Sequence, residues 1–186
     1  MGFFSKDKKQ VEQQAISSIK QTAEPVVNNV PDYVQPAQTS EPKTASVTGS
    51  AGTLSVLVPC GWADFITESA LDSKDSYGIK VYIDTGSEFD PFYAPAVKVS
   101  IFCQGEMFGV NQNKDMFSNS SDLAPLALGN YIWNGYTGLY DDYPTTVLWA
   151  EEGKNIIEIT IVLKTSKGEI SLENKDVRDI IASVSF

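Results

Sequence analysis

The chain has 186 residues, of which 42% are hydrophobic and 20% are charged, and this length is typical of one folded domain with additional sequence. It contains 14 Lys and Arg, 24 Asp and Glu and no His, which gives a formal net charge of −10. The absence of His excludes Ser/His/Asp triads, Cys/His pairs and HExxH zinc sites. The acidic balance, with Arg178 as the only arginine, argues against recognition of nucleic-acid phosphates.

The sequence carries no strong targeting signal. Its first residues lack an apolar run long enough for a secretory signal, and no stretch of about 18 apolar residues could span a membrane. Phe3 and Phe4 precede three lysines, so they predict at most a weak peripheral contact with a membrane. We therefore expect a cytoplasmic protein in which Cys60 and Cys103 are reduced thiols. Their spacing is not that of a metal or redox motif.

Composition divides the chain into three parts. Residues 1–23 are predicted to contain an N-terminal helix, because apolar residues recur there at helical spacing. The apolar face is thin in large residues, so this helix needs a partner surface to be stable. Residues 24–52 contain four prolines among Gln, Thr, Ser and Asn, which predicts a disordered linker. Residues 53–186 hold all the excess negative charge and form the predicted folded domain.

Alternation of apolar and polar residues predicts the strands of this domain. A turn at residues 141–144 joins two of them, residues 67–77 are polar without a clear period, and one or two short helices are expected between residues 106 and 128. The expected strands cover residues 54–58, 79–83, 96–103, 131–136, 145–150 and 156–164.

The domain is predicted to end in a helix capped by Asn174. Four apolar residues at helical spacing give this helix one apolar face, formed by Val177, Ile180, Ile181 and Val184. Runs of strands followed by one clear helix predict an α+β domain with an antiparallel sheet of about six strands.

The two ends of this domain resemble a known superfamily. The first strand ends in Val58-Pro59-Cys60-Gly61-Trp62, which is a Pro-x-Gly-Trp motif. Near the C-terminus, a long strand precedes a short helix that ends within residues 181–186. In these features residues 53–186 resemble the PsbP-like superfamily, which includes the photosystem II extrinsic protein PsbP, a Ran-binding nuclear import factor and small bacterial proteins. The resemblance implies an antiparallel sheet sandwiched between helices, an α/β/α sandwich. It also implies a non-catalytic domain that binds proteins, peptides or small ligands, with no shared catalytic residue.

One short motif has the form of a catalytic site. Ile83-Asp84-Thr85-Gly86-Ser87 places Asp-Thr-Gly-Ser after a predicted strand, as aspartic peptidases do, and a homodimer would supply the second aspartate that such enzymes require. The residues that follow, 88–91, are not the small and apolar ones expected there. Asp-Thr-Gly-Ser is also an ordinary turn sequence, and this interpretation is favoured over a catalytic Asp84. Nearby acidic residues do not match EF-hand spacing, so no metal site is predicted.

Aromatic residues with polar tips gather in one short segment, residues 131–149. Such side chains suit binding interfaces because they are apolar yet can form hydrogen bonds. Five of them are the predicted partner-binding residues: Tyr131, Trp133, Tyr136, Tyr140 and Tyr143. The alternative is that the rings cover the core, which is favoured for Trp133 and Trp149 and stays open for the tyrosines of the turn-rich part.

The sequence therefore predicts a non-enzymatic domain that binds a protein or a small ligand and is tethered to an N-terminal helix. Asp141 and Asp142 beside the tyrosines favour a basic partner. No nucleic acid, cofactor or metal is expected. The alternatives are an aspartic-peptidase-like homodimer that uses Asp84, and a passive structural module of a larger assembly.

Overall fold

The structure is a computed structural model that describes residues 41–68, 76–103 and 114–186. The helix expected within residues 1–23, and most of the linker expected at residues 24–52, lie outside these ranges and stay predictions. The described segments belong to one compact unit.

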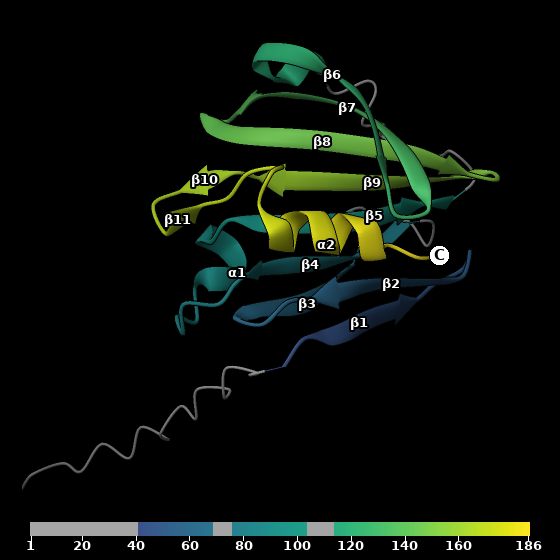
Figure 1. Ribbon diagram of the computed structural model, residues 1–186, viewed down its shortest axis with the longest axis horizontal. Coiled ribbons are helices and arrows are strands. Elements are labelled where there is room, and N and C mark those ends of the chain that lie inside the picture. Colours follow the sequence, from purple (N-terminus) through teal and green to yellow (C-terminus); the bar gives the residue numbers. More distant parts are fainter. Residues whose placement is uncertain (1–40, 69–75, 104–113) are drawn as a thin grey trace, which may run out of the picture. The chain divides into compact units, whose positions relative to one another are not determined.

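A seven-stranded antiparallel sheet forms the centre of this unit (Figure 1). Its order is β3-β4-β5-β9-β8-β7-β6, and all neighbours pair antiparallel. The predicted α+β class with an antiparallel sheet is therefore confirmed. The strands are β3 (Trp62–Glu68), β4 (Ser76–Ile83), β5 (Ala96–Phe102), β6 (Ser118–Leu128), β7 (Tyr131–Tyr140), β8 (Tyr143–Glu152) and β9 (Asn155–Val162).

The edge strand β6 corrects an expectation, because residues 118–128 form a strand where short helices were expected. Its register on β7 shifts twice, between Ser118 and Ser121 and between Leu123 and Leu126, so apolar residues do not alternate along it. Pro125, in the second irregular stretch, adds to this break in the pattern. The helical structure described nearby is η3 (Lys114–Met116), a single 3₁₀ turn.

The other edge strand, β3, was also not predicted. Its adjacent residues Phe65 and Ile66 are both exposed, by 37% and 51%. Neighbouring apolar residues that both face solvent give no alternating signal, so the sequence pattern could not show this strand.

A hairpin of β1 (Lys43–Thr48) and β2 (Thr53–Val58) lies beside the sheet. β1 falls inside the segment 24–52 that composition assigned to a linker, so the domain boundary expected at residue 53 is wrong. The Thr, Ser and Ala residues of β1 are linker-like in composition, yet Ala45 is buried opposite Val56 of β2.

The C-terminal helix α2 (Lys175–Ser183) has the cap and the buried face that the sequence predicted. The Asn174 side chain accepts a hydrogen bond of 2.9 Å from the Asp176 N–H. The four predicted apolar residues, Val177, Ile180, Ile181 and Val184, have no exposed surface. Ser183 Oγ accepts a hydrogen bond of 2.8 Å from the Leu57 N–H, which joins the helix to β2. Within the described ranges, no helix is both long and apolar enough to cross a membrane.

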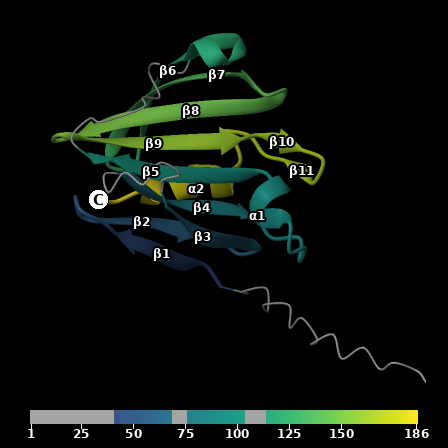
Figure 2. The same cartoon turned by 180° about the vertical axis from the view of Figure 1, so that it is seen from behind.

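The two faces of the sheet have different cover. The inner face, marked by Val99, Leu148 and Ile159, is buried and packs in one core with α2 and the β1–β2 hairpin. The outer face is turned toward the viewer in Figure 2, where α2 lies behind the strands. In the described part of the chain, its helical cover is α1 (Asp90–Tyr93), a four-residue helix at one end, and the single 3₁₀ turn η3. A helical layer on both faces, as an α/β/α sandwich requires, is therefore not observed. A short hairpin of β10 (Lys164–Thr165) and β11 (Gly168–Glu169) follows β9.

Candidate functional site

The aromatic segment forms β7 and β8, and the sheet divides its rings between the two faces. Tyr131 and Trp133 pack on the inner core with ring centroids 5.3 Å apart, and Trp133 is fully buried. Tyr136 and Tyr140 lie on the outer face, while Tyr143 is exposed at the β7–β8 turn. The five predicted partner-binding residues therefore do not form one surface. Trp133 covers the core, whereas Tyr136 and Tyr140 lie together on the outer face.

Tyr136 and Tyr140 line a pocket of about 310 Å³, called here the outer-face pocket. Its size is that of sites for small ligands. β8 and β9 contribute Val147, Glu158 and Thr160 to its lining, and Phe117, just before β6, adds a third aromatic ring.

The register of the sheet explains why these residues meet. One row of outer-face residues runs across six strands: Asp122, Tyr136, Val147, Thr160, Lys98 and Lys80. Glu158 lies two residues from Thr160 on β9 and therefore shares its face. The row is aromatic and apolar over β7 and β8 and basic over β5 and β4. Glu158 lies beside the boundary between these two halves.

The Glu158 carboxylate is half-buried, and Thr160 Oγ1 donates a hydrogen bond of 2.9 Å to it. Burial raises the pKa of Glu158 to about 7, although the Thr160 hydrogen bond and the charge of Lys98 lower it. Burial and the charge of Glu158 together raise the pKa of Tyr136 to about 12, so the phenol stays protonated at neutral pH. The carboxylate is thus a group that changes charge near neutral pH inside an apolar pocket.

Aromatic contacts hold the walls of the pocket in place. The ring of Phe117 meets that of Tyr136 edge-on, at 5.1 Å and 83°, and lies 5.2 Å from that of Tyr140. The Lys114 ammonium lies 6.0 Å from the centre of the Tyr136 ring and 2.5 Å from the Asp122 carboxylate. These contacts fix the rings before any ligand arrives.

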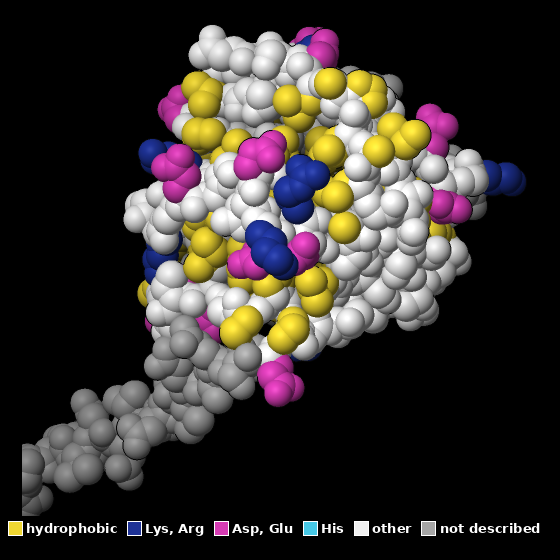
Figure 3. Space-filling view, in the orientation of Figure 1, with side chains coloured by type: hydrophobic (Ala, Val, Ile, Leu, Met, Phe, Trp, Pro, Cys, Tyr) yellow, Lys and Arg dark blue, Asp and Glu magenta, His cyan; other side chains and the backbone are white. Residues whose placement is uncertain are grey.

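The lysines of the basic half, Lys80 and Lys98, do not form an ion pair with Glu158. Lys80 Nζ donates a hydrogen bond of 2.8 Å to the Pro91 carbonyl, and burial and the nearby charge of Lys98 lower the pKa of Lys80. Lys98 is exposed. In the described ranges, neither ammonium forms an ion pair with Glu158. On the opposite side of the molecule, Figure 3 shows Lys and Arg side chains interspersed with Asp and Glu rather than gathered in a patch.

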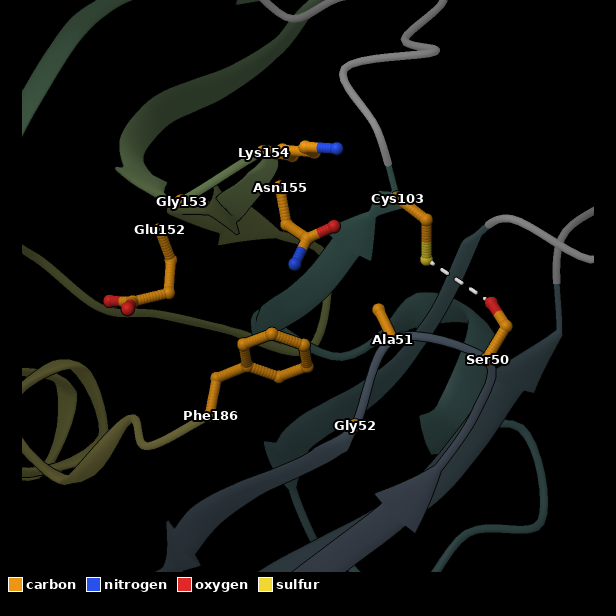
Figure 4. A pocket seen from close by; sticks show the side chains of 9 residues that line it. All are labelled: Ser50, Ala51, Gly52, Cys103, Glu152, Gly153, Lys154, Asn155 and Phe186. Carbon is orange, nitrogen blue, oxygen red and sulfur yellow. Dashed lines mark hydrogen bonds between the residues drawn. The ribbon is translucent and has the colours of Figure 1, made fainter.

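A second pocket, of about 610 Å³, lies where the β1–β2 turn, the end of β5 and the β8–β9 turn meet Phe186 (Figure 4). Cys103 Sγ lies 3.4 Å from Ser50 Oγ. In Figure 4 the Asn155 amide and the Phe186 ring point toward the middle of the pocket, and the Glu152 carboxylate points away. Its lining is mainly turn residues, and its charged residues Glu152 and Lys154 are exposed. We therefore take the outer-face pocket, which brings a half-buried carboxylate into an aromatic cavity, as the candidate site.

The Asp-Thr-Gly-Ser motif that begins at Asp84 forms a turn around the carboxylate of Asp90. Asp84 Oδ1 accepts a hydrogen bond of 2.8 Å from the Gly86 N–H, the pattern of an aspartate-initiated turn. The fully buried group is Asp90, which accepts hydrogen bonds from Thr85 N, at 2.7 Å, and from Ser87 N, at 3.1 Å. These contacts are those of the turn that the sequence favoured over a peptidase site.

Across the three described segments, no three Cys, Asp or Glu side chains are grouped closely enough to hold a metal ion. Cys60 is exposed, Cys103 is buried, and the two are not joined by a disulfide.

Sequence reasoning found Tyr136 and Tyr140 but missed Glu158, Thr160 and Phe117. The one available signal was the alternation in β9, where Glu158 and Thr160 take the positions between buried isoleucines. That pattern predicts only an outward-facing side chain, and most such carboxylates are solvated. Phe117 is distant in sequence, so its place above β7 follows from the pairing of β6 and could not be predicted locally.

No family model and no curated protein matches the chain. Two solved structures match part of it. A protein of Bacteroides thetaiotaomicron VPI-5482 is 15% identical with a TM-score of 0.42 over 77% of this chain, and the chain spans 47% of that protein's length. LpqN, involved in cell envelope biogenesis of Mycobacterium tuberculosis, is 16% identical with a TM-score of 0.33, over 64% of this chain and 76% of LpqN. Matches at these scores carry no functional argument, and the PsbP-like resemblance stays a prediction.

Proposed function

We propose that the domain is a non-enzymatic binding module whose ligand lies in the outer-face pocket. The observation that carries this proposal is a half-buried carboxylate, that of Glu158, inside a cavity of about 310 Å³ with aromatic walls. Small-ligand sites are typically concave and mostly apolar, with a few converging polar groups that fix orientation. Phe117, Tyr136 and Tyr140 supply the apolar surface, and Thr160 and Glu158 supply the polar groups.

The pocket is organised for binding before a ligand arrives. Tyr136 is 1% exposed and is held by the edge-on ring of Phe117. Rings that already contact each other lose little conformational freedom when a ligand binds, so more of the contact energy appears as affinity.

Tryptophol, a neutral indole alcohol, is a suitable probe for this proposal. We expect its addition to the full chain to perturb the backbone amide NMR signals of Phe117, Tyr136 and Thr160. Val162→Trp adds a large ring at a pocket-lining position and should abolish these changes. Ile156→Trp is the matched control, because Ile156 lies on the same face of β9 but does not line the pocket. Unchanged tryptophol binding by Val162→Trp, or perturbations centred on Ser50 and Asn155, would contradict the proposal.

We also propose that the domain is PsbP-like and cytoplasmic. Gly61, at φ 78, turns the chain after β2 so that Trp62 is buried, and Trp62 Nε1 donates a hydrogen bond of 3.2 Å to Asp176 of α2. The two sequence features that carry the resemblance therefore contact each other. The same proposal includes a second layer of helices on the sheet and an N-terminal helix that binds a partner surface.

A further inference from the structure

We propose, building on the proposed function, that the ligand of the outer-face pocket is a small organic amine whose protonated nitrogen pairs with Glu158. Its apolar body would lie against Phe117, Tyr136 and Tyr140. The inference rests on which charged side chains in and around the pocket form ion pairs and which do not.

The Glu158 carboxylate forms no ion pair in the described part of the chain, and the charge of Lys98 acts on it only from beyond ion-pair distance. Its hydrogen-bond donor there is the neutral hydroxyl of Thr160, at 2.9 Å. Lys98, on the neighbouring strand β5, is exposed and forms no ion pair with it. Lys114, above β7, is already paired with Asp122 at 2.5 Å. A ligand cation would supply the direct ion pair that these lysines do not form with Glu158.

The ionisable groups around Glu158 are consistent with a cationic ligand. Tyr136 faces it from β7 and stays neutral, since its pKa is raised to about 12. Glu158 itself is poised near pH 7 because burial opposes its charge. An ammonium group beside it would favour the ionised carboxylate, so binding and ionisation of Glu158 would reinforce each other.

The aromatic walls suit the same ligand class. Cations are attracted to the faces of aromatic rings, and Lys114 already lies 6.0 Å from the centre of the Tyr136 ring. Two further rings, those of Phe117 and Tyr140, lie 5.2 Å apart and offer apolar surface for the body of the ligand. An aromatic or aliphatic amine would use both the carboxylate and the rings.

Three indoles of similar size and different charge test the inference: tryptamine, tryptophol and indole-3-acetate. Titrations followed by amide NMR should show that tryptamine binds the wild-type protein about tenfold or more tightly than tryptophol, as a charge-assisted hydrogen bond provides. Glu158→Gln should abolish this preference while tryptophol still binds. Glu151→Gln is the matched control, because it removes one exposed carboxylate from the same face of the sheet, and it should keep the preference. The amide spectra and thermal melts of both variants establish that they are folded.

The pH dependence of ligand affinity gives a second test. Between about pH 6 and about pH 8 the affinity for tryptamine should rise, because Glu158 loses its proton while the amine keeps its own. The affinity for tryptophol should not rise. Equal binding of tryptamine and tryptophol, both blocked by Val162→Trp, would overturn the amine inference and leave the binding module standing. Preference for indole-3-acetate would also overturn it, and failure of all three indoles to bind would overturn the proposed function as well.

Discussion

Lys167 reaches across the end of the sheet to Asp90, 77 positions earlier in the chain, and pairs with its carboxylate at 2.9 Å. Asp90 is fully buried, and the hydroxyl and N–H of Thr85 and the N–H of Ser87 also donate to it. One carboxylate therefore joins the Asp-Thr-Gly-Ser turn, α1 and the β10–β11 hairpin.

The Asp90 carboxylate should make the stability of the domain depend on pH in the acidic range. Burial alone would raise the pKa of Asp90, but hydrogen bonds from Lys167, Thr85 and Ser87 outweigh it and lower the pKa from 3.8 to about 2. Because the folded pKa is below the unfolded one, the unfolded state binds more protons, and stability falls as the pH drops from about 4 to about 2. The expected loss is about 2 kcal/mol. Urea unfolding of the wild type across this range measures it.

Asp90→Asn tests the same contact at neutral pH. The variant should be less stable than the wild type by about 2 kcal/mol at pH 7 and should lack this part of the acid dependence. Glu169→Gln is the control, because its ion pair with Lys164 is exposed and should matter little. Equal stability of Asp90→Asn and wild type at pH 7 would show that the buried pair does not hold these segments together.

Glu158 should have the opposite effect on stability. Its folded pKa of about 7 is above the usual glutamate pKa of 4.5, so the folded state holds the proton to higher pH and stability falls as the pH rises between these values. The loss should approach about 3 kcal/mol, less any solvent screening. Glu158→Gln should remove this decline and be more stable than the wild type above pH 7. Parallel urea curves for the two proteins at pH 5 and pH 8 would contradict the burial of this carboxylate.

The buried face of α2 gives a further prediction. Ile180→Ala or Ile181→Ala should lower the free energy of unfolding by about 2–5 kcal/mol, because each residue has no exposed surface. Glu173→Ala, at an exposed position before the helix, is the control for urea denaturation. Losses below about 0.5 kcal/mol in both isoleucine variants would place the helix away from the core.

Where local pattern and tertiary position agree, the sequence predicted the fold. The alternation in β5 and β9 and the helical spacing of α2 come from side chains that face one core, so they appear directly in the sequence. β1 could not be recognised because its pairing with β2 outweighs a linker-like composition. The outer-face pocket could not be predicted because it depends on strand order: β6, β7, β8 and β9 must be neighbours before Phe117 can meet Tyr136 near Glu158.

The corrected boundary of the domain can be tested by truncation. Deleting residues 1–40 should leave the melting temperature nearly unchanged, because the helix expected within residues 1–23 has few large apolar residues and residues 24–40 have the composition of a linker. Deleting residues 1–50 also removes β1, its pairing with β2 and the 2.7 Å ion pair between Lys43 and Asp64. That deletion should cost at least about 2 kcal/mol, since β2 loses its ladder of hydrogen bonds. Equal melting temperatures for the two truncated proteins would mean that β1 adds nothing to the fold.

Two glycines offer a matched test of packing beneath α2. Gly129 and Gly153 have similar positive φ angles of 66° and 62°, so alanine should cost each about 1 kcal/mol of backbone strain. At Gly129 the added Cβ would also lie 2.3 Å from the Ala182 carbonyl oxygen, whereas at Gly153 it meets nothing within 4 Å. Gly129→Ala should therefore be clearly the more destabilising in urea unfolding. Similar losses would mean that α2 can move away from the β6–β7 turn.

The irregular strand β6 has a consequence for the behaviour of the protein at high concentration. A regular edge strand presents unpaired N–H and C=O groups on which another chain can add a strand, which is a route to amyloid-like aggregates. β6 ends the sheet with two register shifts and with Pro125, which has no N–H to donate. A second molecule therefore meets an interrupted row of hydrogen-bonding groups, so this edge resists the growth of intermolecular sheets.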